Sequence, residues 1–347
     1  MRPGDKMRAS PTSSAGRPRR FPHVSIRHPT TPAASWPSPQ PEEMRHKVIW
    51  VVGDGRSGTT WVSNLINYRR AYRFLFEPFH PDVVPAMQQF KPFTYLRRGD
   101  HDEYYGNVAQ AVFSGSITHP RVNWFNYGCN SADLLVKDIF GHLLMPWVDK
   151  HFPTVRKVLV LRHPCAVAAS KERLKNWSWV KDPAHLFAQR TLMEDCLSPY
   201  IGSLEWAHNQ FEKYVLIWSI VHHVVLKQLA VGRVHIVFYE MLCADPDNEI
   251  RRMLAYAGEN LDHPLLDPRL AHQYEQPSQT TRPHNSPHRC QDSISRWQQQ
   301  VSDSKVEAAL RILKLFGLHR IYDENPMPNC EAAALMLATP CAPQVRA

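Results

Sequence analysis

The sequence predicts an α/β fold in which a P-loop-type parallel β-sheet is flanked by helices on both faces. Short β-branched and apolar runs recur along the chain and have the composition of buried strands. Segments with helical spacing alternate with these runs. This order is typical of parallel sheets, because each parallel neighbour needs a crossover connection. A glycine-rich turn follows the first run and leads into a helix, which is how a phosphate-binding loop is built.

The first predicted strand covers Lys47 to Val52, and it leads directly into the glycine-rich turn. The three glycines of Gly53 to Gly58 let the backbone turn sharply and approach a ligand closely. Thr59 and Thr60 then open a helix whose free N–H groups face the turn, so we expect an anion there. An ordinary strand-to-helix turn without a ligand is the alternative.

The turn departs from a nucleoside-triphosphate P-loop at one position. The spacing from Gly53 to Gly58 matches such a loop, which then needs a lysine for the phosphates and a hydroxyl for Mg²⁺. Thr59 stands where the lysine is required, and the cation of the turn, Arg56, comes earlier. We therefore expect a loop that binds phosphate but is poorly suited to ATP with a metal.

The composition is that of a globular protein large enough for one large α/β domain or two small ones. The chain has 347 residues, of which 43% are hydrophobic and 21% charged. No apolar run approaches the length of about 20 residues that spans a membrane, and the N-terminus lacks the apolar centre of a signal peptide. The seven cysteines are scattered, without a Cys-x-x-Cys pair. This pattern predicts neither a disulfide framework nor a zinc site, and it favours a reducing, cytoplasmic location.

The net charge of +9 is concentrated near the N-terminus. Residues 1–41 hold seven Lys or Arg and one Asp, and so account for +6 of the total. The remainder is mildly basic, as a pocket for a polyanionic cofactor would explain. A nucleic-acid partner is not expected, because it would need a basic face on the folded domain.

The composition also divides the chain into three parts. Residues 1–43, rich in Pro, Ser, Thr and Arg, are predicted to be a disordered tail, and Met44 is an alternative start. Residues 44–325 are predicted to form the α/β domain, and residues 326–347 a flexible C-terminal tail. The oligomeric state is left open.

The remaining elements follow from the spacing of apolar residues. Strand-like runs are Arg73 to Phe76, Leu134 to Val136, Lys157 to Leu161 and Val234 to Tyr239. Predicted helices are Trp61 to Tyr68, Gly141 to His151, Ala166 to Leu174, Phe187 to Asp195, Phe211 to Val231, Glu249 to Ala257, Ser293 to Gln299 and Asp303 to Phe316. Pro264 to Gln291, rich in Pro, His, Ser and Thr, is expected to be a long loop.

Polar residues follow several predicted strands. Lys137 and Asp138 come after the second buried run, Arg162 after the third and Glu240 after the last. Ligands of parallel sheets bind outside the carboxyl ends of the strands, so we expect one site there, beside the glycine-rich turn.

Arg162 belongs to a second candidate anion site. Ser170 follows it by eight residues on a helix that Pro164 opens, and two helical turns return it to nearly the same face. An Arg with a hydroxyl can grip a phosphate, although an Arg at a strand end also often forms a surface ion pair.

Together the two sites resemble the sulfotransferases that use 3′-phosphoadenosine-5′-phosphosulfate, in particular carbohydrate-type and bacterial members. Those enzymes hold the 5′ side of the donor with (Arg/Lys)-Ser-Gly-Thr-Thr-Trp, here Arg56 to Trp61. They hold its 3′-phosphate with Arg and Ser at the spacing of Arg162 and Ser170. The resemblance runs from about Val48 to Tyr322. Further matches are Phe76-Glu77-Pro78, Val136-Lys137-Asp138 and Tyr239-Glu240-Met241-Leu242.

The resemblance implies a role for each matching residue. Arg56 would neutralise the bridging oxygen as the sulfonate leaves, and Lys137 would contact the transferring sulfonate. Trp61 would lie against the adenine or belong to the core. No metal is expected. The implied donor-binding residues are Arg56, Ser57, Gly58, Thr59, Thr60, Trp61, Arg162 and Ser170.

The catalytic base is the one departure from the family pattern. Cytosolic members place a histidine two residues after the lysine, and here that position is Ile139. We expect Glu77 to serve as the base, or else to brace the loop through an ion pair with Arg56. His80 and Asp138 are the reserve candidates, and water is the remaining one.

The implied function is sulfonate transfer to an acceptor hydroxyl on a carbohydrate, a glycolipid or a small-molecule alcohol. The Phe-Glu-Pro match favours a carbohydrate, whereas the aromatic segment Tyr95 to Tyr127 would suit a hydrophobic alcohol. A P-loop kinase or NTPase that consumes ATP with Mg²⁺ is one alternative. A non-catalytic nucleotide-binding protein is the other.

Overall fold

Five parallel strands form the sheet that positions the site, in the order β2-β3-β1-β4-β5. The computed structural model describes residues 46–126, 129, 131–174, 177, 179–280 and 290–338. Its sheet confirms the predicted parallel α/β class. The strands are β1 (Val48–Val52), β2 (Arg73–Phe76), β3 (Leu134–Asp138), β4 (Arg156–Leu161) and β5 (His235–Phe238).

The helices alternate with the strands along most of the chain. The α-helices are α1 (Thr59–Ile66), α2 (Glu103–Phe113), α3 (Met145–His151), α4 (Pro164–Arg173), α5 (Ala184–Phe187), α6 (Arg190–Leu192), α7 (Gln210–Gln228), α8 (Tyr239–Ala244), α9 (Pro246–Ala257), α10 (Pro268–Glu275), α11 (Asp303–Leu315) and α12 (Cys330–Ala338). The 3₁₀-helices are η1 (Pro85–Met87), η2 (His142–Leu144), η4 (Ser198–Trp206), η5 (Pro264–Leu266), η7 (Gln291–Ser293), η8 (Arg296–Gln299) and η9 (Leu318–Arg320), and η3 (Met193–Leu197) is a π-helix.

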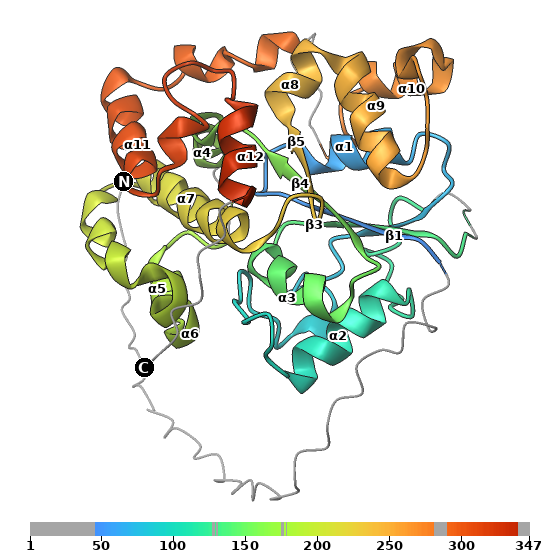
Figure 1. The fold of residues 1–347 in the computed structure, drawn as a ribbon, viewed down its shortest axis with the longest axis horizontal. Helices are drawn as coiled ribbons and strands as arrows, with labels where there is room; N and C mark the ends of the chain where they lie inside the picture. Colours follow the sequence, from blue (N-terminus) through green and yellow to red (C-terminus); the bar gives the residue numbers. More distant parts are fainter. Residues whose placement is uncertain are drawn as a thin grey trace, which may run out of the picture. The chain divides into compact units, whose positions relative to one another are not determined.

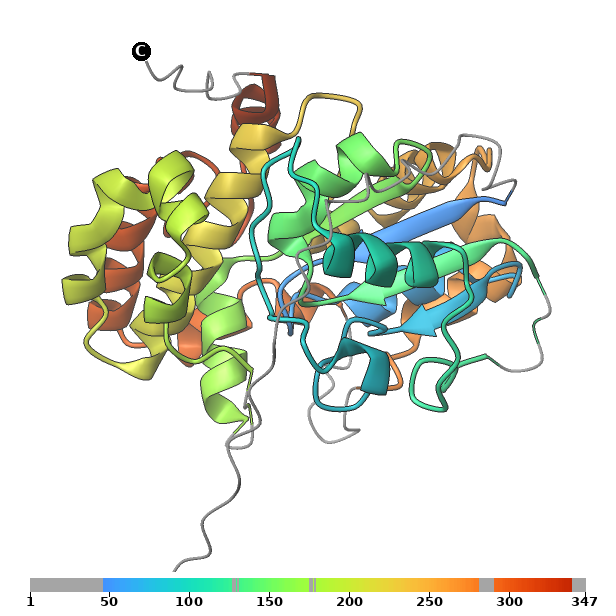
Figure 2. The same ribbon diagram turned by 90° about the horizontal axis from the view of Figure 1, so that it is seen from below.

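The side chains of β1 alternate between two buried clusters, one on each face of the sheet. Trp50 and Val52 pack into the cluster that contains α2, α3 and α7, whereas Ile49 and Val51 pack into the cluster that contains α1 and α9. Figures 1 and 2 show α9 and α10 on one side of the sheet and α2 and α3 on the other. The helices therefore flank both faces, as predicted.

Helix α7 is the long buried helix of the fold. Asn209 caps it, and a capping box with Glu212 satisfies N–H groups at its start. Most of its residues are buried on all sides by neighbouring helices. None of the described helices, α7 included, is long and apolar enough to cross a membrane.

Two segments that we expected to be irregular contain helices. In the predicted loop Pro264 to Gln291, Asp267 caps α10 and Pro268 occupies its first position, while Leu270 is fully buried. The prediction of a flexible tail at 326–347 is wrong for the part that forms α12, because Ala333 and its apolar neighbours pack against α7. The predictions for residues 1–43 and the end of the tail at 339–347 lie outside the described residues.

A disulfide joins Cys243 of α8 to Cys290, with a Cα–Cα distance of 5.3 Å. The expectation that the cysteines form no disulfide framework did not anticipate this bond. The two residues lie 47 positions apart, and α9 and α10 fold back between them to bring them together. Cysteine usage thus no longer supports a reducing compartment.

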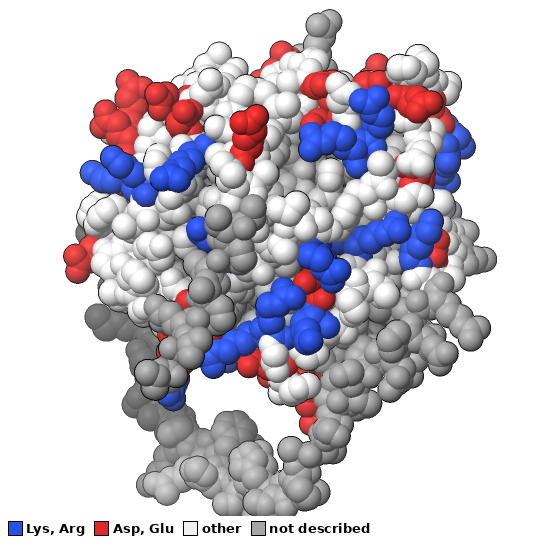
Figure 3. All heavy atoms as spheres, in the orientation of Figure 1, with Lys and Arg blue, Asp and Glu red and all other residues white. Residues whose placement is uncertain are grey.

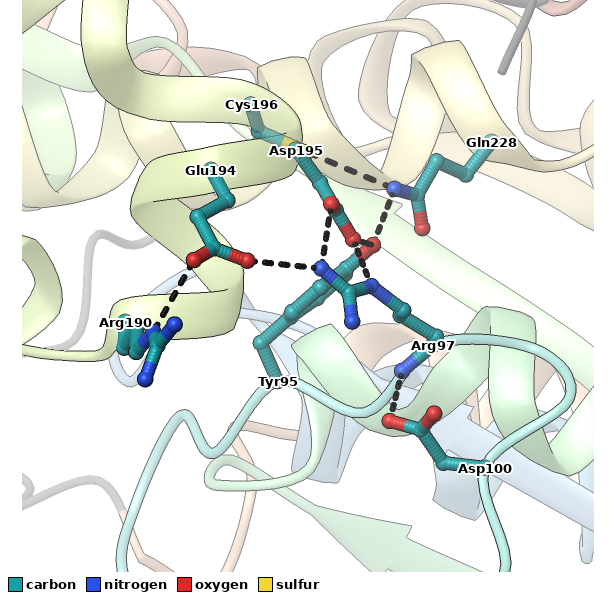
Figure 4. Close-up of polar contacts among 8 residues, drawn as sticks. All are labelled: Tyr95, Arg97, Asp100, Arg190, Glu194, Asp195, Cys196 and Gln228. Carbon is teal, nitrogen blue, oxygen red and sulfur yellow. Dashed lines mark hydrogen bonds and ion pairs between the residues drawn. The ribbon is translucent and has the colours of Figure 1, made fainter. Parts of the chain in front are cut away.

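A polar network joins the segment that precedes α2 to the π-helix η3 (Figure 4). Arg97 donates two hydrogen bonds to Asp195, of 2.6 and 2.8 Å, and one of 3.1 Å to Glu194. The Tyr95 hydroxyl donates to Asp195 at 3.2 Å and accepts from Gln228 of α7 at 2.8 Å. The network therefore connects three parts of the chain.

We expect Asp195→Asn to lower the free energy of unfolding by about 2 kcal/mol, because hydrogen bonds to charged groups contribute roughly 1.5–3 kcal/mol. Urea unfolding would measure the loss. The matched control is Glu205→Gln, which changes an exposed acid of η4. Equal stability of the two variants would contradict the role given to Asp195.

Candidate active site

A cavity of about 1060 Å³ lies at the carboxyl ends of the strands, where the sequence placed its site. Its lining includes the glycine-rich turn, the ends of β2 and β3, α4, α8 and the segments around η7 and η8. Ser57, His80 and Asp138 are not part of it. The predicted residues that line it are Arg56, Gly58, Thr59, Thr60, Trp61, Glu77, Lys137, Arg162 and Ser170.

The turn presents the N-terminus of α1 to this cavity. Gly58 occupies the N-cap with a φ of 97°, a conformation that other residues rarely adopt, and a side chain at this position would collide with the Tyr239 ring. The Ser57 hydroxyl closes the turn by donating to the Asp54 carbonyl at 2.6 Å. No side chain caps the helix, so its first N–H groups, those around Thr59, are placed to bind an anion.

A buried ion pair ties the turn to α4. Lys171 Nζ lies 2.6 Å from each carboxylate oxygen of Asp54, and the two side chains are only 3% and 4% exposed. The Lys171 ammonium also lies over the ring of Trp177 at 5.3 Å. The sequence reasoning missed this pair, because nothing in the local spacing relates residues 117 positions apart.

Guanidinium groups gather on the α4 side of the cavity. Arg56 Nε donates to Ser170 Oγ at 3.2 Å, and Arg162 donates to the Arg56 carbonyl at 3.2 Å. Burial, followed by the charges of Arg162 and Arg173, lowers the pKa of Arg56. Arg173 and Arg296 also line the cavity. Like charges held this close can bind an anion.

The structure thus brings together the two predicted anion sites and adds two cations to which the sequence reasoning gave no role. Arg173 could have been found, because it lies three residues after Ser170 and so on the same side of α4. Arg296 comes from a distant segment, where Arg296-Trp297 is only a loose match to the family pattern.

Trp61 lines the cavity and also packs tightly, being only 7% exposed. Its ring lies 5.6 Å from the Tyr239 ring and 5.5 Å from the Tyr274 ring. Its Nε1 donates to the Tyr274 carbonyl at 3.2 Å. Trp61 is therefore an aromatic wall held in place by its neighbours, and its contact with adenine stays a prediction.

Glu77 lies between two cations on the other side of the cavity. Lys137 Nζ lies 2.6 Å from Oε1 of Glu77, and Arg121 Nη2 lies 3.0 Å from Oε2. Burial acts to raise the pKa of Glu77, but the charges and hydrogen bonds of Lys137 and Arg121 outweigh it and hold that pKa below its usual value. Glu77 is therefore ionised at neutral pH.

We expected Glu77 either to act as the base or to form an ion pair with Arg56, and Arg56 is the wrong partner. Glu77 pairs with Lys137 and Arg121, because β2 and β3 are neighbours and Phe76 lies opposite Lys137 in the register. Both Arg56 (φ 82°) and Glu77 (φ 48°) have left-handed backbones, a strain that is common at functional sites. Arg121 was not predicted, and no local motif marks it.

The two reserve bases have structural partners. The fully buried Asp138 accepts from the N–H groups of Phe140 and Gly141 at 2.9 and 2.6 Å, and burial raises its pKa to about 6. The His80 ring packs 4.5 Å from the Trp179 ring, and burial lowers its pKa. Neither side chain lines the cavity, whereas Glu77 does.

Apolar and aromatic side chains line part of the cavity that the Glu77–Lys137 pair also lines. They come from β2, the end of β3, α4 and the segment after α4. Among the described residues, no group of three or more His, Cys, Asp or Glu side chains could hold a metal ion. The apolar wall consists of Phe76, Ile139, Ala166, Leu174, Trp177 and Trp179.

Two buried histidines should make the protein sensitive to acid. Burial lowers the pKa of His163, beside Arg162, and of His222 on α7 to about 4. An unfolded histidine titrates near 6.5, so below that pH the unfolded chain binds protons that the folded chain does not. The contribution of these two histidines to the free energy of unfolding is therefore complete above about pH 6.5, and it is lost as the pH falls toward 4. Each histidine contributes at most roughly 3 kcal/mol.

Urea unfolding at pH 7.5, 5.5 and 4.5 would measure this loss. Asp138, Glu240 and Glu249, whose pKa values burial raises, act in the opposite direction, whereas burial also lowers the pKa of His142 and His235 and so adds to the loss. His222→Gln should reduce the dependence on pH, because it removes one of the buried histidines. Constant stability from pH 7.5 to 4.5 would contradict the prediction.

A family model described as "Sulfotransferase family" matches residues 49–263, which is more than half of the 347 residues. The chain therefore belongs to the sulfotransferase family. This confirms the resemblance drawn from the two phosphate motifs and the enzyme class that it implied, a sulfotransferase with 3′-phosphoadenosine-5′-phosphosulfate as co-substrate.

Solved sulfotransferase structures are similar to the chain at low identity, and no curated protein matches it. The sulfotransferase domain of the Synechococcus PCC 7002 olefin synthase is 14% identical, covers 79% of this chain and 96% of its own, and has a TM-score of 0.42. Retinol dehydratase, solved with androsterone and the inactive cofactor PAP, is 15% identical, with coverages of 79% and 82% and a TM-score of 0.41. Sulfotransferase STF9 from Mycobacterium avium is 15% identical, with coverages of 81% and 78% and a TM-score of 0.40.

Proposed function

We propose that this sulfotransferase transfers a sulfonate group from 3′-phosphoadenosine-5′-phosphosulfate to the hydroxyl of a small, apolar acceptor. The hydrogen bond between Arg56 and Ser170 carries the proposal, because it joins the glycine-rich turn to the Arg162 site within one cavity. The donor has a phosphate group at each end of one nucleoside. Two anion sites side by side suit such a molecule better than ATP, whose phosphates form a single chain.

Each part of the donor has a group to receive it. The N–H groups around Thr59 would bind the 5′-phosphate, while Arg162 and Ser170 would bind the 3′-phosphate. Arg56 would neutralise the bridging oxygen, and Lys137 the transferring sulfonate. By analogy with phosphoryl transfer, such a loose transition state needs positioning and charge more than covalent help.

The acceptor class is inferred from the other half of the cavity. Phe76 lies against the Lys137 ammonium, with Nζ 4.8 Å from its ring centroid, and Ile139, Trp177 and Trp179 belong to the apolar wall of the same cavity. A wall of this kind favours an apolar or ring-bearing alcohol or phenol, because such ligands gain by leaving water. A carbohydrate acceptor, which the Phe-Glu-Pro match favoured, would need more polar partners than this wall offers.

The test combines calorimetry with an acceptor screen. We expect adenosine 3′,5′-bisphosphate to bind without Mg²⁺, and ATP to bind weakly with or without it. With labelled donor, we expect phenols and apolar alcohols to accept sulfonate in preference to free sugars. Tight binding of Mg²⁺–ATP would favour a kinase or NTPase. Binding of the bisphosphate without transfer to any acceptor would favour a non-catalytic protein.

Glu77→Gln tests whether this carboxylate takes the acceptor proton. Glutamine keeps the size of the side chain and can still contact Lys137, but it is not a base. We expect kcat to fall by about 10²-fold or more, within the range for general bases, with the affinity for adenosine 3′,5′-bisphosphate unchanged. A variant that loses stability but keeps its kcat would make Glu77 a structural partner of Lys137 only.

A further inference from the structure

One wall of the donor cavity is formed by a segment that contains only short 3₁₀-helices. These are η7 and η8, which include Ser293 and Trp297. The Ser293 carbonyl accepts a hydrogen bond of 3.3 Å from Arg162, and its hydroxyl lies 2.7 Å from that of Tyr239. At the far end, Trp297 stacks on His163 with ring centroids 4.1 Å apart. The position of this wall therefore helps to determine where the Arg162 guanidinium lies.

The near end of the wall is held by the disulfide. Cys290 precedes η7, lines the cavity and is half-buried, whereas Cys243 of α8 is fully buried in the apolar cluster beneath it. The Cys290 carbonyl also accepts a hydrogen bond of 2.6 Å from the Ser293 hydroxyl. The disulfide thus holds Cys290 in place, and Cys290 in turn holds Ser293. Because Ser293 accepts a hydrogen bond from Arg162, the disulfide also affects the position of Arg162.

We propose that the Cys243–Cys290 disulfide is a thiol-exchange site that sets the affinity for the donor. In the disulfide form the wall is in place and the donor binds tightly. In the dithiol form the near end of the wall is released, Arg162 loses a fixed partner and the donor binds weakly. This inference rests on the proposed function, because it assigns the cavity to the nucleotide donor.

The exchange takes place with two equivalents of a small thiol of the glutathione class. The first thiolate attacks Sγ of Cys290, because Cys290 lines the cavity and Cys243 is fully buried. The bond to Cys243 breaks, and the Cys243 sulfur leaves and takes up a proton. The second thiolate attacks the mixed disulfide and releases the Cys290 thiol. Two small thiols are thereby oxidised to one disulfide, and the protein disulfide is reduced to two thiols.

The same geometry predicts an effect in the reverse direction. A nucleotide in the cavity would cover Cys290 and block the approach of the thiolate. Coupling between two sites is reciprocal, so if reduction weakens nucleotide binding, nucleotide binding must resist reduction.

The experiment measures the binding of adenosine 3′,5′-bisphosphate to the full chain by calorimetry, before and after reduction with dithiothreitol. We expect affinity to fall about tenfold on reduction, within the 5–150-fold range typical of coupled sites. Cys290→Ser should bind like the reduced chain and no longer respond to dithiothreitol. Cys330→Ser, which removes a free cysteine of α12, is the matched control and should respond like the wild type.

The outcomes separate this inference from the proposed function. Equal affinity of the oxidised and reduced wild type overturns the thiol-exchange proposal alone. Absence of binding by the oxidised chain overturns the proposed donor, and this proposal with it. If Cys290→Ser does not fold, the comparison of oxidised and reduced wild type still decides. Slower alkylation of Cys243 and Cys290 under dithiothreitol when the bisphosphate is present would support the proposal independently.

Discussion

Arg56→Ala is expected to reduce sulfonate transfer on the order of 10³-fold, the largest effect of any single change on activity. Arg56 lies in the turn between the two anion sites, where its guanidinium contacts Ser170. Charge develops on the bridging oxygen as the sulfonate leaves, and alanine cannot neutralise it. Transfer of labelled sulfonate under saturating donor would measure the loss.

Ser170→Ala is the matched comparison for Arg56. Its hydroxyl is assigned to the 3′-phosphate, away from the reacting bond, so we expect affinity for adenosine 3′,5′-bisphosphate to fall about tenfold, or roughly 1.4 kcal/mol, with kcat retained. Arg56→Lys should recover part of the activity, because a lysine occupies this position in related loops. Unchanged donor affinity in both alanine variants would contradict the site assignment.

Asp54→Ala is expected to have the largest effect on stability, a loss of about 3–5 kcal/mol in the free energy of unfolding. The substitution leaves the ammonium of Lys171, 3% exposed, without its carboxylate in the interior. Removing one partner of a buried pair costs more than removing both, because the remaining charge stays desolvated. Urea unfolding would measure the loss, and donor binding should weaken with it, because the pair holds the turn against α4.

The double variant Asp54→Ala with Lys171→Met is the control. Methionine fills much of the volume of lysine and carries no charge, so we expect the double variant to regain more than half of the lost stability. A loss below about 1 kcal/mol for Asp54→Ala would show that solvent reaches the pair, since exposed pairs contribute that little.

Local chemistry alone was enough to predict the strand, turn and helix that open the candidate site. An apolar run, three glycines and two threonines determine β1, the turn and α1, because the interactions involved reach only a few residues along the chain. The same reasoning holds for Arg162 and Ser170, whose separation is set by a single helix, α4. The family resemblance rested on these two stretches, and the family match confirms it.

The partners of the charged and sulfur-bearing residues were decided by the tertiary structure. Glu77 meets Lys137 because β2 and β3 pair in parallel with Phe76 opposite Lys137, a register that no local spacing reveals. Cys243 meets Cys290 because two helices fold between them. The sequence by itself thus determined which residues form the glycine-rich turn. The fold decided which charge Glu77 balances and which cysteines join, because ion pairs and disulfides depend on distances across the structure and not on positions along the chain.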